Sequence, residues 1–393
     1  MLDFLSKIVY NIIMKKVVIA PDSFKGTLSS AEVCEIIGQA VFKVLPKTKT
    51  VKIPIADGGE GTSEAFLLAL GGSKIFVRTK NPLFEDIEAF YALLKDQKTA
   101  VIETAAASGL TLVEGRKNAL DASTYGTGLL IGDALNRGCK KIILGLGGSA
   151  TTDGGAGILA ALGAGLFDSN RREITPSNCG LEQLCRIEPE TLDTRLSGCE
   201  IVAACDVDNV LCGPGGAAYV FGPQKGADED MVKTLDENLL KYAEILLEKT
   251  GKNIKDIPGT GAAGGILASL LSFPEHINCK TQSGIELMLN AVNFDDVISD
   301  ADLVITGEGR FDRQSLEGKA VSGIAKRTKR QNKPLIVISG GTGDYTDEIY
   351  KLGISAVFGA VSGIYADFDE LKRHCRDDLY KTAENILRLL RFQ

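Results

Sequence analysis

The sequence predicts an α/β protein of more than one domain, and three observations support this. Short apolar runs alternate with helical patterns along the whole chain, which is typical of sheets covered by helices. The 393 residues exceed the usual domain of ~150 residues, so two or three domains are expected. No long Pro- or Ser-rich linker separates them, which is compatible with one domain inserted into another.

The first strand–loop–helix unit is the clearest. Val17–Ala20 is typical of a buried strand, and the polar loop Pro21–Gly26 follows it. A helix is expected after this loop because Ser29 and Glu32 have capping-box spacing and apolar residues then recur at helical intervals. Pro46 is expected to end this helix.

The rest of the chain continues the same alternation. Strands are predicted at Val51–Ile55, Ala100–Glu103, Lys141–Leu146, Glu200–Ala204, Asp302–Thr306, Leu335–Ser339 and Ser355–Gly359. Helices are predicted at Thr62–Leu70, Gly128–Arg137, Asp230–Lys249, Ala263–Leu271 and Asp369–Leu390. Ile87–Leu94 is less regular and is compatible with an antiparallel strand.

Charge, cysteine content and hydropathy narrow the class of protein. The 44 basic and 51 acidic residues give a net charge of −7, whereas a nucleic-acid-binding surface needs a basic patch. The nine cysteines contain no C-x-x-C pair, as expected for reduced thiols in the cytoplasm. No apolar run approaches the ~18 residues of a membrane span. We therefore expect a cytoplasmic protein with neither nucleic-acid nor membrane partners.

The first 13 residues, Met1–Ile13, are predicted to be an N-terminal extension. They are apolar but interrupted by polar residues, and they lack the basic start and small-residue cleavage site of a signal peptide. A second methionine, Met14, directly precedes the first strand pattern. We expect removal of the extension to leave solubility and activity unchanged.

Glycine and histidine contents bear on the chemistry. The only histidines, His276 and His374, are far apart in sequence, which argues against a multi-histidine zinc site or a histidine relay. The 44 glycines make up about 11% of the 393 residues, compared with a usual ~7%, and they follow no repeat. We expect them to shape specific turns, where the backbone takes positive φ or approaches a ligand closely.

The densest glycine cluster, Gly145–Gly157, follows the predicted strand Lys141–Leu146. Its N–H and hydroxyl groups could wrap a polyphosphate at the end of a parallel strand. Close packing of a strand against a helix is an equally weighted alternative. The candidate cofactor-binding residues of this cluster are Gly145, Gly147, Gly148, Ser149, Gly154 and Gly155.

Known nucleotide signatures match poorly. The chain has no G-x-x-x-x-G-K-[ST] motif, so a Walker-type NTPase is disfavoured. Gly259–Gly264 fits G-x-G-x-x-G, but the preceding Lys255–Pro258 does not have a strand pattern, so the dinucleotide context fails. A close-packed helix N-terminus is the better interpretation of this motif.

Charged and hydroxyl residues stand at the ends of predicted strands, beside glycines. They are Asp22, Ser23, Lys25, Asp57, Glu60, Asp206, Asp208, Glu308, Arg310 and Asp312, with Lys225 in a later Gly-Pro-Gln-Lys segment. Phosphoryl transfer needs cations and Mg²⁺ on the phosphates and a carboxylate near the attacking hydroxyl, and it requires no histidine. The repeated placement therefore favours function over simple solvation.

Seven blocks together resemble the type-1 glycerate kinase family. They are Val18–Gly26, Pro54–Thr62, Gly145–Gly157, Ala204–Asn209, Phe221–Gly226, Gly261–Gly265 and Ile305–Arg310. The resemblance implies ATP-dependent phosphorylation of glycerate. It also implies a Rossmann-like three-layer domain (14–76 and 285–393) with a second α/β domain (77–284) inserted into it. Two positions depart from the family pattern, with Thr152 where Asn is usual and Phe311 where an aliphatic residue is usual.

The resemblance supports these loops as a group, and we infer the role of each residue from its chemistry. Arg310 is the candidate carboxylate clamp, because a guanidinium pairs with a carboxylate through two parallel hydrogen bonds. The other expected roles are D-glycerate contacts at Asp22, Ser23, Glu308 and Asp312, phosphoryl neutralisation at Lys25 or Lys225, proton acceptance at Asp206, and Mg²⁺ near Asp57, Glu60 or Asp208. Lys25 and Asp206 are the predicted catalytic residues, and ATP with Mg²⁺ is the expected cofactor set.

Three questions stay open at this point. The family includes enzymes named for either product, and we favour phosphorylation at the 2-hydroxyl over the 3-hydroxyl. A dinucleotide-dependent oxidoreductase of a small hydroxy acid and a non-catalytic glycerate-binding module remain alternatives. The oligomeric state, including a homo-oligomer, is also open.

Overall fold

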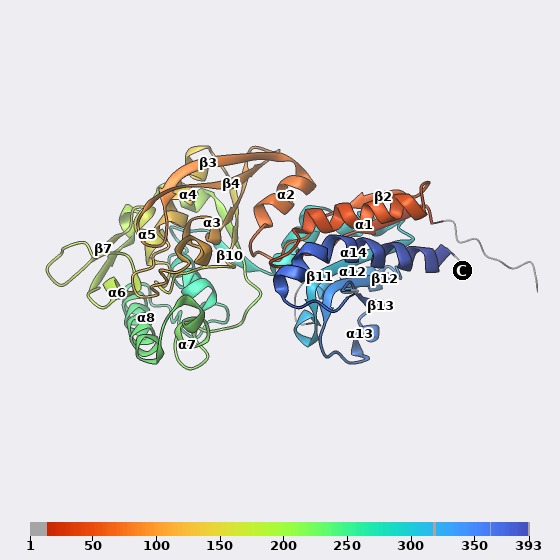
Figure 1. Cartoon of the computed structure of the whole chain (residues 1–393). Helices are drawn as coiled ribbons and strands as arrows, with labels where there is room; N and C mark the ends of the chain where they lie inside the picture. The colour runs from red at the N-terminus through yellow and green to blue at the C-terminus, as the bar shows by residue number, and fades with distance from the viewer. Residues whose placement is uncertain (1–13, 317–319, 362, 392–393) are drawn as a thin grey trace, which may run out of the picture. The chain divides into compact units, whose positions relative to one another are not determined.

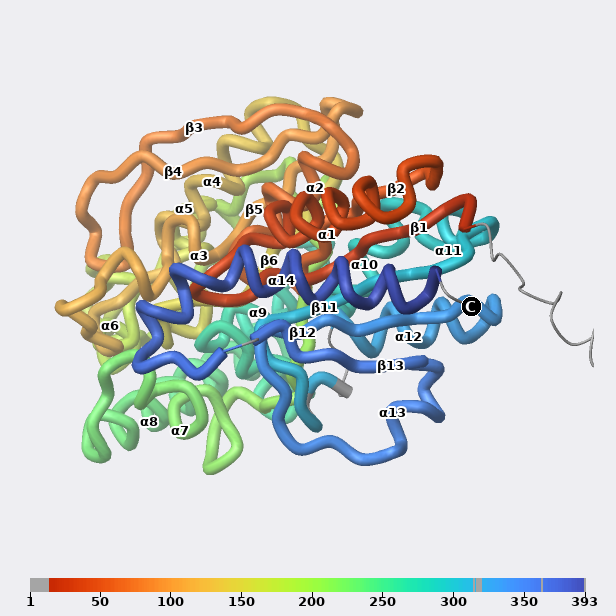
Figure 2. Tube along the Cα trace, turned by 45° about the vertical axis from the view of Figure 1, so that its right-hand side comes forward, coloured from red at the N-terminus to blue at the C-terminus, as the bar shows by residue number. Residues whose placement is uncertain are grey.

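A computed structural model describes residues 14–316, 320–361 and 363–391, and these fold into two compact units of mixed α/β structure (Figures 1 and 2). Residues up to Asp57 and from Ile285 onward form the first unit, and Gly58–Gly284 forms the second. The predicted extension Met1–Ile13 lies outside the described residues. The division at Asp57 precedes the join expected near residue 76, because the segments that follow Asp57 pack within the second unit. The domain boundaries near 76 and 284 stay a prediction.

The first unit is built on a five-stranded parallel sheet. In spatial order its strands are β13 (Ile354–Gly359), β12 (Leu335–Thr342), β11 (Leu303–Phe311), β1 (Lys16–Ile19) and β2 (Lys49–Lys52). From β1 the chain moves to one side, to β2, and later returns to the other side, to β11. The strand order therefore reverses between β1 and β11, and such a switch point is where open α/β sheets bind ligands.

Helices cover both faces of this sheet. Right-handed crossovers that leave β1 and β11 in opposite directions place α1 (Ser30–Val44) and α12 (Ala320–Arg330) on opposite faces. The long C-terminal helix α14 (Phe368–Arg391) packs alongside α1 (Figure 1). Three short helices complete the unit: α10 (Gly284–Ala291), α11 (Phe294–Ile298) and α13 (Glu348–Lys351).

The predicted start of α1 is confirmed in detail. Ser29 accepts a hydrogen bond from the backbone N–H of Glu32, and the Glu32 carboxylate accepts one from the Ser29 N–H at 3.0 Å. The predicted apolar stripe is buried against the sheet and α14, and its members are Val33, Ile36, Ile37, Ala40, Val41 and Val44. Local capping and burial of one face thus determine this helix together.

The second unit holds a six-stranded mixed sheet. In spatial order its strands are β10 (Cys279–Gln282), β9 (Glu200–Ala204), β6 (Lys141–Gly145), β5 (Thr99–Glu103), β4 (Asp86–Leu94) and β3 (Gly72–Lys80). β4 pairs antiparallel with both β3 and β5, which confirms the interpretation of Ile87–Leu94. Here the spatial order follows the chain order, so this sheet has no reversal.

The helices and a small hairpin of the second unit enclose its main apolar core. They are α2 (Thr62–Leu70), α3 (Thr104–Ser108), α4 (Tyr125–Asn136), α5 (Ala156–Ala161), α6 (Asn178–Leu181), α7 (Ala217–Phe221), α8 (Glu229–Thr250), α9 (Ile266–Ser272) and the hairpin β7–β8 (Gly165–Phe167, Arg186–Glu188). The helix expected at Ala263–Leu271 starts later than predicted, because Ala263 takes a left-handed conformation before α9 begins.

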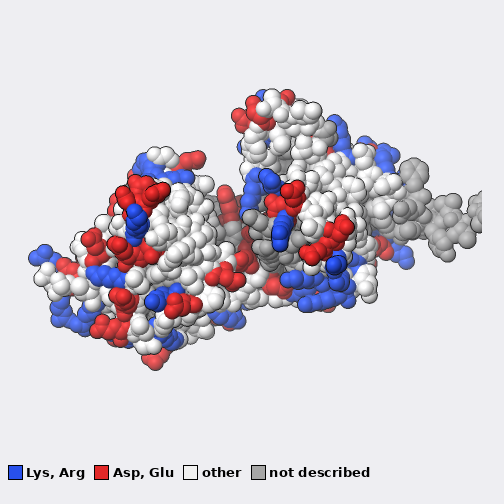
Figure 3. Space-filling model, turned by 90° about the horizontal axis from the view of Figure 1, so that it is seen from below, with Lys and Arg blue, Asp and Glu red and all other residues white. Residues whose placement is uncertain are grey.

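The charged surface and the cysteines are as the amino-acid composition led us to expect. Acidic and basic side chains both occur across the face of the molecule drawn in Figure 3. All nine cysteines lie in the described part of the chain and are unpaired, with Cys34, Cys139 and Cys199 buried. Among the described residues, no helix combines the length and apolar character needed to cross a membrane.

Candidate active site

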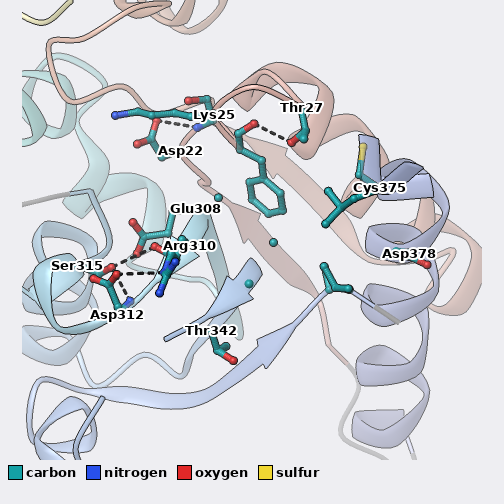
Figure 4. Close-up of a pocket in the computed structure, with 18 of the residues that line it drawn as sticks. Asp22, Lys25, Thr27, Glu308, Arg310, Asp312, Ser315, Thr342, Cys375 and Asp378 are labelled. Atoms are coloured by element: carbon teal, nitrogen blue, oxygen red, sulfur yellow. Dashed lines mark hydrogen bonds and ion pairs between the residues drawn. The ribbon is translucent and has the colours of Figure 1, made fainter. Parts of the chain in front are cut away.

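A cavity of about 690 Å³ opens within the first unit, at the carboxyl ends of β1, β11 and β12 (Figure 4). It lies at the switch point of the sheet, where the loops after β1 and β11 diverge. Seven predicted site residues line it: Asp22, Ser23, Lys25, Asp57, Glu308, Arg310 and Asp312. The structure therefore brings together all the candidates that belong to this unit.

Asp22 is a strongly perturbed carboxyl group of this cavity. It is only 9% exposed, and its Oδ1 accepts the Ser23 N–H at 2.7 Å. Burial raises the pKa of Asp22 to about 7, and the negative charge of Asp57 adds to that shift, while Ser23 and Lys25 oppose it. Two carboxyl groups that repel each other in this way create a place where a cation would be stabilised.

The loop after β1 is a tight turn that presents Lys25. Phe24 and Leu28 exchange backbone hydrogen bonds of 2.8 and 3.0 Å, and Gly26 takes φ +80° between them. Lys25 is exposed at the tip of this turn, and Figure 4 shows it beside Asp22. The turn thus carries a cation at the mouth of a cavity rich in carboxylates.

On the opposite wall, Arg310 and Asp312 form an ion pair. Arg310 Nε lies 3.4 Å from Asp312 Oδ2, and the Arg310 side chain is 75% exposed. The Asp312 N–H donates to Ser315 Oγ at 3.1 Å, which ties this segment into a turn after β11 (Figure 4). The guanidinium is therefore held at the cavity mouth by a carboxylate from the turn that follows its own strand.

The polar lining residues that were not predicted from sequence are Thr27, Ser315, Thr342 and Asp378, and Cys375 contributes a thiol. Thr342 follows the glycine pair Gly340–Gly341 at the end of β12. That pair repeats the glycine-at-strand-end pattern that marked the other loops, so the signal was present in the sequence. The remaining lining is largely apolar and includes Phe24, Ala360, Val361, Phe368 and Leu371.

In the second unit, the chain after Asp57 lies directly on the ends of β6 and β9. The Gly147 N–H donates to Gly58 O at 3.1 Å. A Cβ on Gly145 would come within 2.7 Å of Gly58 O, and one on Gly58 within 2.7 Å of the Ala204 Cβ. Glycine is therefore required here for backbone to pack on backbone. Glu60 is exposed in this loop.

Glu103 at the end of β5 fixes the start of α2. Its carboxylate accepts the N–H groups of Gly61 and Ser63 at 3.1 and 2.7 Å, so it supplies the cap that Gly61 lacks. Burial raises the pKa of Glu103, and these hydrogen bonds act in the opposite direction. The sequence did not mark Glu103, because its partners lie about 40 residues away in the chain.

The glycine cluster divides into two parts. Gly147 is half-buried and Gly148 is exposed with φ +75°, whereas Gly154 and Gly155 are buried. The Gly154 N–H donates to Gly264 O at 2.9 Å, and a Cβ on Gly155 would meet the Ile266 backbone. The packing alternative accounts for Gly154 and Gly155, and only the Gly147–Gly148 part reaches the surface.

Beneath this cluster lies a buried polar network. Asp153 is fully buried, and it accepts the N–H and Oγ1–H of Thr124 at 2.7 and 2.8 Å and the N–H groups of Gly155 and Gly157 at 3.1 Å. Lys225 is also buried, at 2% exposure, and burial lowers its pKa to about 7. Thr152, the departure from the family pattern, is likewise buried.

Asp206 and Asp208 are exposed in the loop after β9. Both Asp206 carboxylate oxygens lie 3.2 Å from the Gly284 backbone nitrogen. Among the described residues, no group of three or more His, Cys, Asp or Glu side chains is placed to hold a metal ion. Mg²⁺ often binds through one or two carboxylates and the substrate phosphates, so this observation is compatible with a nucleotide-linked cation.

Comparison with known proteins gives one consistent result. Residues 17–391 match the model of the glycerate kinase family. Over 94% of its length the chain is 44% identical to a glycerate kinase of Bacillus subtilis and to a glycerate 2-kinase of Escherichia coli K12, covering 96% and 97% of those proteins. A crystal structure provisionally assigned as glycerate kinase 2 of Salmonella typhimurium LT2 is similar at a TM-score of 0.85 and 42% identity, covering 96% of this chain and 98% of that one.

Proposed function

The chain belongs to the glycerate kinase family, and from that premise we propose that it transfers the γ-phosphoryl group of ATP to the 2-hydroxyl of D-glycerate, giving 2-phosphoglycerate and ADP. The observation that carries the proposal is the cavity of the first unit, which combines Arg310 with several carboxyl groups at a sheet switch point. The preference for the 2-hydroxyl is supported by the name of the Escherichia coli relative.

Glycerate is a small carboxylate with two hydroxyl groups, and the cavity offers partners for both features. Arg310 is proposed to bind the carboxylate through its fork of N–H groups, while Asp312 limits the orientations of the guanidinium. Asp22, Ser23 and Glu308 are proposed to fix the hydroxyl groups, since carboxylate and hydroxyl oxygens accept their hydrogen bonds.

Lys25 is proposed to neutralise charge on the transferring phosphoryl group. Its ammonium is exposed and attached to a tight turn at the cavity mouth, so it can follow the phosphoryl group with little backbone movement. Asp206 remains the proposed acceptor of the proton from the attacking hydroxyl. Its hydrogen bond to the Gly284 N–H would orient the carboxylate for that role.

ATP and Mg²⁺ are the proposed cofactors. The Gly147–Gly148 turn would bind the nucleotide phosphates, because it is the surface-exposed part of the glycine cluster and Gly148 has the left-handed conformation found in anion-binding turns. Asp57 is the proposed Mg²⁺ ligand of the first unit, and its repulsion of Asp22 fits a cation there. Bound Mg²⁺ would neutralise phosphate charge. Glu60 and Asp208 remain candidate ligands from the second unit.

We also place the enzyme in the cytoplasm, which its unpaired cysteines support. Its partners would then be D-glycerate and ATP.

The test is an ADP-release assay with D-glycerate and Mg-ATP, followed by NMR of the product. Glycerate-dependent ADP release with 2-phosphoglycerate as product supports the proposal. Release with 3-phosphoglycerate would contradict only the choice of hydroxyl. Glycerate binding without ADP release would favour the non-catalytic module, and nicotinamide- or flavin-dependent oxidation of glycerate would favour the oxidoreductase.

A further inference from the structure

Lys225 is a buried cation directly beneath the proposed phosphate-binding turn. It is 2% exposed, and its Nζ donates to Thr151 O at 2.6 Å and to Ser149 Oγ at 3.2 Å. Ser149 and Thr151 are themselves buried. An ammonium group is costly to remove from water unless hydrogen bonds compensate, so these two contacts account for its position.

The loop that carries Lys225 is shaped to turn this side chain inward. A single 3-10 turn, Pro223–Lys225, ends at Gly226, which takes φ +91°. On the outside of the same loop, the Lys117 Nζ donates to Gln224 O at 3.2 Å, in an exposed contact. Lys117 thus contacts the loop from outside, whereas Lys225 belongs to the loop and its side chain reaches the glycine cluster.

The two acceptors of Lys225 immediately follow the exposed part of the cluster. Gly148 O accepts the Leu110 N–H, and the Ala150 N–H donates to Ser108 O, both at 2.9 Å. These bonds tie the turn to the segment around α3, and the Lys225 hydrogen bonds tie it to the Pro223–Lys225 loop. Without these hydrogen bonds the backbone of the turn would be free to take other conformations, because glycine restricts φ and ψ very little.

We propose that Lys225 is a positioning residue that holds the Gly147–Ser149 turn in the shape that binds the nucleotide phosphates, without itself touching the nucleotide. The identity of the anion rests on the proposed function, whereas the support of the turn rests on the contacts above. Burial lowers the pKa of Lys225 to about 7 and the charge of Asp153 opposes this shift, but the neutral amine can still donate both hydrogen bonds.

The test compares Lys225→Met with Lys117→Met by two measurements. The first is amide hydrogen exchange over residues 147–152 in nucleotide-free protein. The second is the Kd for Mg-ATP by titration calorimetry, with kcat and the KM for glycerate measured alongside. For Lys225→Met we expect faster exchange in this segment and a Kd raised by at least ~10-fold, the equivalent of about one buried hydrogen bond, with an unchanged glycerate KM. For Lys117→Met we expect no change in exchange or Kd.

Each other outcome contradicts the positioning role in a defined way. A raised Kd with unchanged exchange in the free protein means that Lys225 contacts the nucleotide directly. Faster exchange with an unchanged Kd means that the contact is structural only, and no change in either also refutes the role. If Lys225→Met does not fold, Ser149→Ala removes one of the two acceptors. Amide exchange in nucleotide-free protein is then the deciding measurement, because Ser149 is itself a candidate cofactor-binding residue; faster exchange supports the positioning role and unchanged exchange refutes it.

The same measurements separate this role from the proposed function. If wild-type protein binds Mg-ATP but does not phosphorylate glycerate, the proposed function fails and the positioning role is still decided by exchange and Kd. If wild-type protein binds no Mg-ATP, both are refuted.

Discussion

Gly147→Ala tests whether backbone packing at the ends of β6 and β9 requires glycine. A Cβ at position 147 would lie 2.6 Å from Gly59 Cα and 3.3 Å from Gly58 O. Carbon atoms in contact normally lie ~3.5–4.0 Å apart, so the two segments would have to separate by about 1 Å. We expect overpacking to cost ~1–3 kcal/mol and loss of the Gly147 N–H to Gly58 O bond ~0.5–1.5 kcal/mol. The substitution should therefore destabilise the protein by about 1.5–4.5 kcal/mol.

Gly132→Ala provides the matched control. Gly132 lies inside α4, and beyond the backbone of its own helix a Cβ there would meet no described atom within 4 Å. Alanine favours a helix interior over glycine by ~0.8–1 kcal/mol, so this variant should be stabilised. Urea unfolding followed by circular dichroism measures both changes, and nucleotide affinity should fall only for Gly147→Ala. A Gly147→Ala protein within about 0.5 kcal/mol of wild type would refute the packing argument, because that is the range of ordinary surface substitutions.

Three further predictions concern single residues. Arg310→Ala should raise the KM for glycerate with little change in the KM for ATP, and steady-state kinetics that show an unchanged glycerate KM would remove Arg310 as the clamp. Lys25→Ala and Asp206→Asn should each lower kcat by at least ~100-fold if these side chains act in the transition state, so near-normal turnover in either variant excludes that residue. Since Lys225 has its pKa lowered to about 7, the unfolded chain binds more protons than the folded one between pH 7 and about 10.5. Wild-type stability should therefore rise with pH across this window relative to Lys225→Met, and a thermal-unfolding difference that is flat from pH 7 to 9.5 would show that Lys225 does not titrate there.

The fold was largely predictable because the informative signals are local. The capping box at Ser29 and Glu32 and the buried apolar runs of β1, β6 and β9 correspond to elements found in the structure. β3 was missed because it is an edge strand with mostly exposed or half-buried residues, which leaves little hydrophobic pattern to detect. α12 was also missed, although its apolar and basic residues alternate at helical spacing.

The sequence predicted which residue types form the candidate site, but only part of their arrangement in the folded chain. Asp22 and Arg310 were marked because a charged residue beside glycine at a strand end is a local pattern, and both line the same cavity. The hydrogen bonds of Glu103 and Lys225 depend on segments about 40 and 75 residues away. No local pattern carries such contacts, so the burial of Lys225 became visible only in the folded chain.

The excess of glycine has two physical causes, and they can be separated position by position. Gly58 and Gly145 are fixed by contacts with neighbouring atoms at distances that exclude a side chain. Gly154 and Gly155 are buried and left-handed, with neighbours from α8 and α9 respectively. Gly148 differs from all four, because it is exposed and left-handed and its Cβ would meet only the Ala105 side chain, at 3.1 Å. Close contacts are sufficient to require glycine at the first four, although Gly58, Gly154 and Gly155 also take positive φ. At Gly148 backbone conformation is the stronger constraint, so the case for an anion-binding turn rests on this part of the cluster.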